Sequence, residues 1–201
     1  GVKHTNYTER FKQGEPIFCF DKEMADGNKS FIEDENSWKN WYKLIMGCNV
    51  VLDNVDNMSG NATDKQHIKG QAMLLRAYYY MRLAMVYAQP YRIDPDKNLG
   101  VTLITTSRVN DTEPARSTVK QTYRFIEEEL IKASELLRDF VPTTKYRVQK
   151  TMADILLARL YLYEENWDKA IEYAGVAIQE GPALTDFNNL VAMANIFVTS
   201  Y

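Results

Sequence analysis

Cysteine and histidine are scarce in this chain of 201 residues, with two of each. The cysteines, Cys19 and Cys48, do not lie in a C-x-x-C pair, and the histidines, His4 and His67, are isolated. The sequence therefore contains no spacing typical of a zinc site or of a cysteine–histidine nucleophile. The two cysteines could form one disulfide, but we expect two buried thiols.

Glycine and proline are also few, at 9 and 6 residues, which is too few for a sandwich or barrel with many tight turns. No uncharged apolar stretch approaches the roughly 18 residues that a membrane-spanning helix needs. Aromatic residues are plentiful, with 13 Tyr, 8 Phe and 3 Trp, and most of them fall in helix-like segments. These features predict an all-α protein.

Positive charge is not in excess, because 27 acidic residues outnumber 24 basic ones and the net charge is -3. The basic residues of the most strongly helical segment, Lys65, Lys69, Arg76 and Arg82, do not form a dense stripe. The sequence therefore gives no indication of nucleic-acid binding.

Motifs of catalysis are missing as well: the chain has no G-x-S-x-G, no H-E-x-x-H and no glycine-rich phosphate loop. The candidate pairs of catalytic acids are Asp53 with Asp56 and Glu164 with Glu165. Asp53 and Asp56 fall near the end of a predicted helix, where negative charge is unfavourable, and surface solvation explains them. We expect a protein that is not an enzyme and needs no cofactor or metal.

Apolar residues recurring at three and four positions predict five helices. We expect them at about 38–55, 64–87, 118–137, 150–165 and 167–179. An irregular N-terminal arm, 1–36, precedes a helical domain, 37–201, and a long loop, 88–117, interrupts that domain. The second helix is apolar on nearly every side and should be central.

Two helix starts carry the residues of a capping box, in which a threonine and a glutamine three positions later exchange hydrogen bonds. These are Thr63 with Gln66 and Thr118 with Gln121. The acidic run Glu127-Glu128-Glu129 lies in the third helix and is expected to be a solvated face.

The last two helices form a hairpin with the pattern of a degenerate tetratricopeptide repeat of about 34 residues. With Thr151 as the first position, six residues fall on signature positions: Leu157, Ala158, Tyr161, Ala170, Ala177 and Pro182. One repeat cannot bury its own apolar face, so the second and third helices are expected to form another repeat, opened by the long loop.

Six blocks of sequence, in this order and spacing, resemble the N-terminal half of the SusD/RagB-like nutrient-uptake outer-membrane lipoproteins, with the RagB-type branch most similar. The blocks are Trp41–Ile45 with Asn49, Gln71–Tyr80, Tyr87–Tyr91, Leu99–Val101, Arg116–Val119, and Ala158–Leu162 with Asn166–Ile171. The resemblance implies a SusD-like α-α superhelix of tetratricopeptide type. Proteins of this family are well over twice as long, which predicts an N-terminal fragment.

The resemblance also implies a function. Such a protein is tethered at the cell surface of the outer membrane by an N-terminal lipid anchor, which this chain does not contain. It captures oligosaccharides, or peptides in some branches, and delivers them to a SusC-like TonB-dependent transporter without catalysis. The alternative is a tetratricopeptide scaffold for protein–protein interaction, which should show several uninterrupted repeats.

Aromatic residues are the candidates for ligand contact, since aromatic rings stack on sugars and bury much area. Trp41 and Trp167 lie on apolar stripes and are expected to pack between helices. Trp38 is the less certain packing residue, and Phe20 and Phe31 lie in the irregular arm, where binding residues are common. We therefore predict Trp38, Phe20 and Phe31 as ligand-binding residues.

Overall fold

The computed structural model describes residues 15, 18–22, 37–108, 114–144 and 146–183. Its helical elements are α2 (Ser37–Asn54), a short 3-10 helix η2 (Val55–Asn57), α3 (Ala62–Tyr87), α4 (Val119–Leu136), α5 (Lys150–Tyr163) and α6 (Trp167–Glu180). In these ranges the only β-type pairing is an isolated bridge between Leu99 and Thr118. The all-α prediction is confirmed, with five long helices close to the expected positions.

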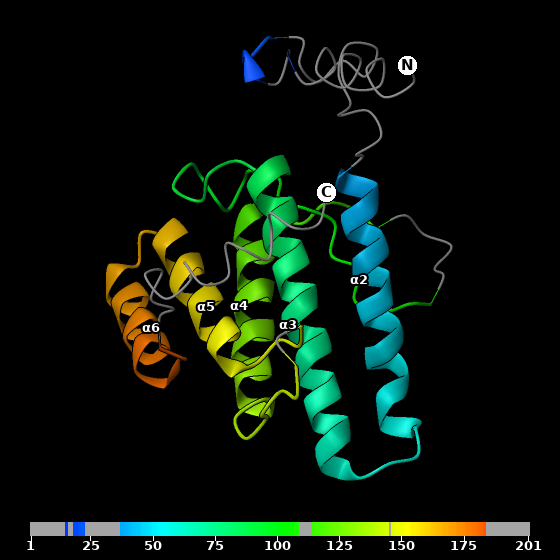
Figure 1. Cartoon of the computed structure of the whole chain (residues 1–201). Coiled ribbons are helices and arrows are strands. Elements are labelled where there is room, and N and C mark those ends of the chain that lie inside the picture. Colours follow the sequence, from blue (N-terminus) through cyan, green and yellow to red (C-terminus); the bar gives the residue numbers. More distant parts are fainter. Residues whose placement is uncertain (1–14, 16–17, 23–36, 109–113, 145, 184–201) are drawn as a thin grey trace, which may run out of the picture.

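The helices stand side by side, and each packs on the one that follows it in the chain (Figure 1). The α3 helix lies between α2 and α4, and α5 joins α4 to α6. Leu74, Ala77, Tyr80 and Leu83 of α3 are fully buried. This confirms that the helix with apolar residues on nearly every side is central.

The helix caps follow the prediction in one of two cases. Thr118 caps α4, its hydroxyl accepting a hydrogen bond from the Gln121 backbone at 3.1 Å, and Gln121 accepts one in return from the Thr118 backbone at 2.9 Å. The predicted box at Thr63 is wrong. Asn61 caps α3 instead, accepting from the Asp64 backbone N–H at 2.7 Å, because asparagine is as strong a cap as threonine and stands two residues earlier.

The predicted helical hairpin is α5 and α6. Tyr161 of α5 and Ala170 of α6 are both buried in the hydrophobic core, as the repeat pattern requires. Glu165 turns the chain with a φ of 60°, the left-handed conformation that commonly ends a helix. Asn166 then caps α6.

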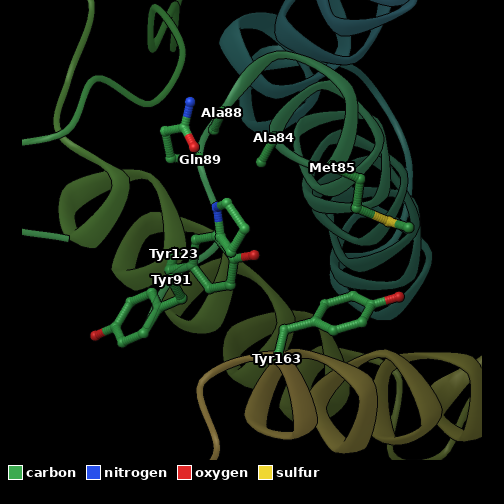
Figure 2. A pocket seen from close by; sticks show the side chains of 8 residues that line it. Ala84, Met85, Ala88, Gln89, Tyr91, Tyr123 and Tyr163 are labelled. Atoms are coloured by element: carbon green, nitrogen blue, oxygen red, sulfur yellow. The ribbon is translucent and has the colours of Figure 1, made fainter. Parts of the chain in front are cut away.

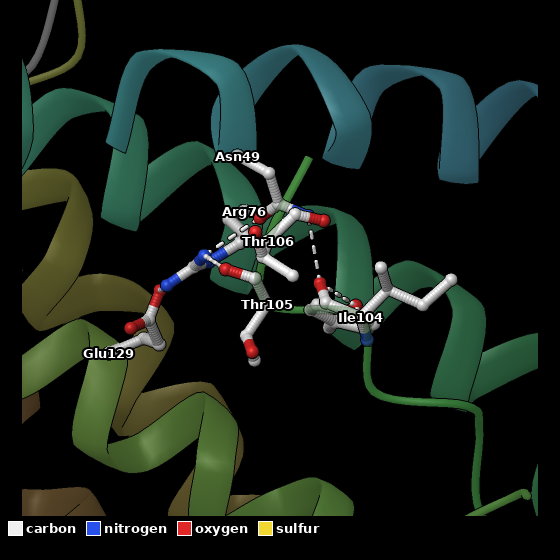
Figure 3. A network of polar contacts seen from close by, with 7 residues as sticks. Asn49, Arg76, Ile104, Thr105, Thr106 and Glu129 are labelled. Atoms are coloured by element: carbon white, nitrogen blue, oxygen red, sulfur yellow. Dashed lines mark hydrogen bonds and ion pairs between the residues drawn. The ribbon is translucent and has the colours of Figure 1, made fainter. Parts of the chain in front are cut away.

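A buried ion pair joins the middle of the molecule (Figure 3). Arg76 of α3 donates from Nε to Oε2 of Glu129 in α4 at 2.7 Å, and from Nη1 to Oδ1 of Asn49 in α2 at 2.7 Å. The side chains of Arg76 and Glu129 are each only 8% exposed. The prediction of a solvated acidic run is therefore wrong for Glu129, because three consecutive helical residues span more than one face and this one faces α3.

The loop after α3 is fastened by its backbone to helical side chains. Tyr80 Oη donates to Ile104 O at 2.8 Å and accepts from Ile104 N at 2.7 Å. Asn49 donates to Ile104 O and Thr106 O, and Tyr42 donates to Thr102 O. Residues 101–106 therefore follow one fixed path along the α2–α3 surface.

Gly100 is the point of closest approach between this loop and α4. A Cβ atom at this position would lie 2.1 Å from Oγ1 of Thr122 and 2.7 Å from the Thr118 carbonyl oxygen. Only glycine fits there, which gives a physical reason for the Leu99-Gly100-Val101 block.

Two further expectations need correction. Both cysteines are free thiols, but only Cys48 is buried, since Cys19 lies exposed in the segment 18–22. Trp167 is 55% exposed, because the apolar stripe that carries it faces outward from α6.

Within the described ranges, no group of three or more His, Cys, Asp or Glu side chains could hold a metal ion. No helix in those ranges is long and apolar enough to cross a membrane.

Candidate functional site

A small aromatic pocket opens where α3 ends and meets α4 and α5, and we call it the tyrosine pocket (Figure 2). Its volume is about 250 Å³. It is lined by Ala84, Met85, Ala88, Gln89, Pro90, Tyr91, Tyr123 and Tyr163. Pro90 cannot continue the helix, so the chain turns out of α3 and places Tyr91 against α4.

Three tyrosines from distant parts of the chain form the walls. The rings of Tyr91 and Tyr123 lie 4.9 Å apart between centroids and are tilted by 48°. Tyr163, from the last turn of α5, extends toward Met85 across the pocket (Figure 2). Burial raises the pKa of Tyr123 to about 12 and also raises that of Tyr91, so both are neutral hydroxyls at physiological pH. The walls combine apolar ring faces with hydroxyl groups, as ligand pockets for sugars do.

Acidic groups stand close to these tyrosines. Glu164 follows Tyr163 directly, and its charge contributes to the raised pKa of both Tyr91 and Tyr123. Burial, with the Glu127 carboxylate as the second cause, raises the pKa of Glu164 from 4.5 to about 7. Lys169 opposes this effect only in part.

Lys169 is occupied by other partners. Its ammonium group lies 3.3 Å from Oε1 of Glu127 and 3.3 Å from the Tyr161 hydroxyl, which itself donates to Glu127. Among the described residues, no hydrogen bond or ion pair is formed by the Glu164 carboxylate. Of the candidate acid pair, Glu165 is exposed and Glu164 is partly buried.

A second depression, the polar groove, adjoins the tyrosine pocket and shares Ala88 and Gln89 with it. Its volume is about 460 Å³. The other lining residues are Val86, Tyr87, Lys97, Asn98, Leu99 and Arg116. Arg116 is fixed by donating to Gly100 O at 2.8 Å and to Tyr87 O at 2.9 Å. Stacking surfaces and hydrogen-bonding side chains thus lie on either side of Gln89.

Neither of the predicted ligand-binding residues that the structure describes, Trp38 and Phe20, lines this site. Trp38 packs on Tyr87 with ring centroids 4.9 Å apart, and its backbone N–H donates to the Tyr87 hydroxyl at 3.1 Å. Trp38 therefore supports a residue of the polar groove. Phe20 is 86% exposed in the segment 18–22, and Phe31 lies outside the described residues. The structure does not bring Phe20 and Trp38 together, and their role in binding stays a prediction.

An apolar groove of about 720 Å³ runs along the outward face of α5 and α6. It is lined by Thr151, Ile155, Ala158, Ala174, Ala177, Ile178, Gly181, Pro182 and Ala183. Apart from Thr151 and backbone atoms, this lining offers no groups that could hydrogen-bond sugar hydroxyls. We therefore place the candidate site at the tyrosine pocket and the polar groove.

Sequence reasoning missed the residues of the tyrosine pocket. Tyr91 and Gln89 belong to a block that carried the family resemblance, so a signal was present for them. Tyr123 and Tyr163 read as ordinary residues of helical stripes, because nothing local shows that their helices meet the end of α3.

Comparisons with known proteins agree with the fold. A family model of SusD-like proteins, described as "Starch-binding associating with outer membrane", matches residues 20–162. SusD-like protein P25 of Formosa agariphila is 23% identical over 177 residues, which are 84% of this chain and 31% of that protein.

Solved structures from Bacteroides vulgatus are also similar. A SusD-like carbohydrate binding protein is 30% identical with a TM-score of 0.68, over 76% of this chain and 33% of that one. A SusD superfamily protein is 28% identical with a TM-score of 0.69, over 78% and 37%. The chain spans about a third of the length of these relatives.

Proposed function

Because the chain belongs to the SusD-like family, we propose that it is part of a non-catalytic surface protein that captures oligosaccharides. The observation that carries this proposal is the pairing of the tyrosine pocket with the polar groove across Gln89. Aromatic faces can stack on a sugar ring while Gln89, Asn98 and Lys97 offer hydrogen bonds to hydroxyl groups. The carbohydrate-binding relative from Bacteroides vulgatus supports the same ligand class.

The size of the pocket limits what it can hold. Pockets that enclose a drug-sized ligand measure about 300–1,000 Å³, and the tyrosine pocket measures about 250 Å³. We infer that one sugar unit occupies the tyrosine pocket and that the rest of the oligosaccharide continues along the polar groove. A peptide side chain is the alternative occupant.

The wider role is also part of the proposal. The family description places its members in association with the outer membrane, and we propose a cell-surface location with an N-terminal lipid anchor outside this chain. The ligand would pass to a SusC-like TonB-dependent transporter. We also propose that residues 1–36 form an arm preceding a helical domain, 37–201. The likeness to the RagB-type branch stays a prediction.

Ligand capture is tested by titrating the chain with a panel of neutral oligosaccharides in a calorimeter, with Tyr91→Ala as the binding-site variant. We expect at least one glycan to bind and Tyr91→Ala to weaken it about tenfold or more. Tyr146→Ala is the matched control, because that tyrosine is 97% exposed and is not among the residues that line the pocket. A panel without any binding glycan would contradict the proposal.

The transporter partner requires a separate test. The full-length parent, tagged and recovered from detergent-solubilised membranes, should carry a large β-barrel TonB-dependent transporter that mass spectrometry identifies. Recovery of soluble adaptor partners would favour the tetratricopeptide scaffold instead.

A further inference from the structure

Arg116 places a fixed positive charge at the polar groove. Its Nε atom donates to the carbonyl oxygen of Gly100 at 2.8 Å, and its Nη2 atom donates to the same oxygen and to the carbonyl oxygen of Tyr87 at 2.9 Å. These bonds join the two stretches of chain that form the walls of the groove, residues 86–89 and 97–99. The guanidinium group is therefore held in position before a ligand arrives, which lowers the entropy cost of binding.

No acidic side chain of the described residues neutralises this charge. The acceptors of Arg116 in that part of the chain are all backbone carbonyl oxygens, and the two hydrogens of Nη1 have no acceptor there. Arg116 is also exposed, so a ligand can reach it. Arginine stays charged at any physiological pH, and it offers strong charge-assisted hydrogen bonds to oxyanions.

A second cation, Lys97, lines the same groove. Its ion pair with Asp94 has 3.2 Å between Nζ and Oδ2, and the two side chains are 84% and 49% exposed. Exposed pairs of this kind contribute little to stability, so Lys97 can turn to a ligand at small cost. None of the eight residues that line the groove is acidic. The groove thus carries two cations and no anion, in a chain whose net charge is -3.

We propose that the polar groove binds the acidic group of a sugar unit, a uronic acid carboxylate or a sulfate ester, with Arg116 as its counter-ion. This inference rests on the proposed function and names the ligand class of the same site. A neighbouring unit of the same oligosaccharide stacks in the tyrosine pocket, which shares Ala88 and Gln89 with the groove. Gln89, between the two, offers hydrogen bonds to the hydroxyl groups.

An acidic peptide carries the same kind of charge but fits the site less well. Its carboxylates stand at the ends of flexible side chains, which must be ordered on binding. The acidic group of a sugar is attached to a rigid ring beside several hydroxyl groups, and the adjoining tyrosine pocket offers faces on which such rings stack. We therefore favour the acidic sugar and treat the acidic peptide as an outcome of the test.

The experiment compares three forms of each of three hexamers. The forms differ only at carbon 6 of the sugar ring, which carries the alcohol, the carboxylate or the sulfate ester. The backbones are β-1,4-linked glucose, β-1,4-linked mannose and α-1,4-linked galactose. The 201-residue chain is titrated with each in a calorimeter at pH 7 and moderate salt. We expect at least one backbone to bind about tenfold more tightly in an acidic form than as the alcohol, which corresponds to about 1.4 kcal/mol. The acidic form that binds more tightly identifies the source of the group.

Three variants locate the effect, with the ratio of the acidic to the neutral affinity as the readout, because a ratio cancels any general loss of binding. Arg116→Gln removes the fixed charge, so the preference should fall to about twofold or less. Lys97→Gln should reduce the preference by about half, and its side chain is 84% exposed, so the fold is unaffected. Arg138→Gln is the matched control, because this exposed arginine lines neither the polar groove nor the tyrosine pocket. Circular dichroism verifies that each variant is folded.

The outcomes separate the inference from the proposed function. Equal binding of all three forms, weakened in Tyr91→Ala, would overturn the acidic-sugar inference and leave glycan capture standing. Failure of every acidic form, or tighter binding of hexaglutamate than of the acidic hexamers, would also overturn it, while the panel of neutral glycans tests capture separately. A preference that persists in both Arg116→Gln and Lys97→Gln, or that falls equally in Arg138→Gln, would overturn the assignment to the polar groove.

Discussion

Replacement of Glu129 by glutamine tests the energetic role of the buried ion pair at the centre of the bundle. The carboxylate lies 2.7 Å from both Nε and Nη2 of Arg76, and both side chains are 8% exposed. Removal of one partner of a buried pair costs about 3–5 kcal/mol, because the other charge is left uncompensated. Arg76 keeps its bonds to Asn49 Oδ1 and Thr105 O, so we expect the lower end, about 3 kcal/mol.

The neighbouring residue provides a matched control. Glu128 pairs with Arg124 at 2.9 Å, but these side chains are 61% and 78% exposed. Exposed pairs contribute about 0–1 kcal/mol, so Glu128→Gln should cost about 0.5 kcal/mol or less. The two substitutions are chemically identical and adjacent in the sequence, which makes burial the main difference between them.

Urea denaturation followed by far-UV circular dichroism at pH 7 gives the free energy of unfolding of each variant. The double variant Arg76→Met with Glu129→Leu should be less destabilised than the sum of its single changes, since no buried charge remains. Equal costs for Glu128→Gln and Glu129→Gln, or strict additivity in the double variant, would refute the reasoning.

Three other substitutions have defined outcomes. Glu164 has a raised pKa, so its ionisation opposes folding as the pH rises from 4.5 to about 7. A pKa shift of this size corresponds to about 3 kcal/mol of folding free energy. Because the side chain is partly solvated, we expect Glu164→Gln to stabilise the fold by only about 1 kcal/mol at pH 8, and not at pH 4, measured by thermal unfolding. Asp53 accepts hydrogen bonds from Thr106 and Ser107, so Asp53→Asn should speed hydrogen exchange at the Ser107 amide; unchanged exchange would contradict this role. Gly100→Ala should cost about 1–3 kcal/mol through overpacking, and a loss below about 0.5 kcal/mol would mean that the loop can shift away from α4.

Periodicity predicted the helices well, because a stripe of apolar residues specifies both a helix and the face it buries. The central position of α3 followed from apolar residues around its whole circumference. The capping box at Thr118 also followed from local sequence, since its hydrogen bonds join residues three positions apart. At Asn61 the same reasoning failed, because two strong caps stood close together and the earlier one was used.

Features that join distant residues could not be predicted in this way. Arg76 and Glu129 are 53 positions apart, and nothing near Glu129 distinguishes it from Glu128. The tyrosine pocket combines Tyr91, Tyr123 and Tyr163, which come together only because α3, α4 and α5 pack in order. The exposure of Trp167 depends on what its apolar stripe faces, which the stripe itself does not specify.

The loop over residues 101–106 is held chiefly through its backbone, by side chains of α2 and α3. Val101 also anchors the loop by its buried side chain, and the Thr106 hydroxyl donates to Asp53, whereas Thr105 is exposed and attached through its carbonyl oxygen. Substitutions at Thr105 should therefore be tolerated far better than substitutions at Asn49 or Tyr80. An exposed position on a loop with a fixed path can diversify without loss of the fold, so evolution can alter what this face presents while the helices beneath it stay the same.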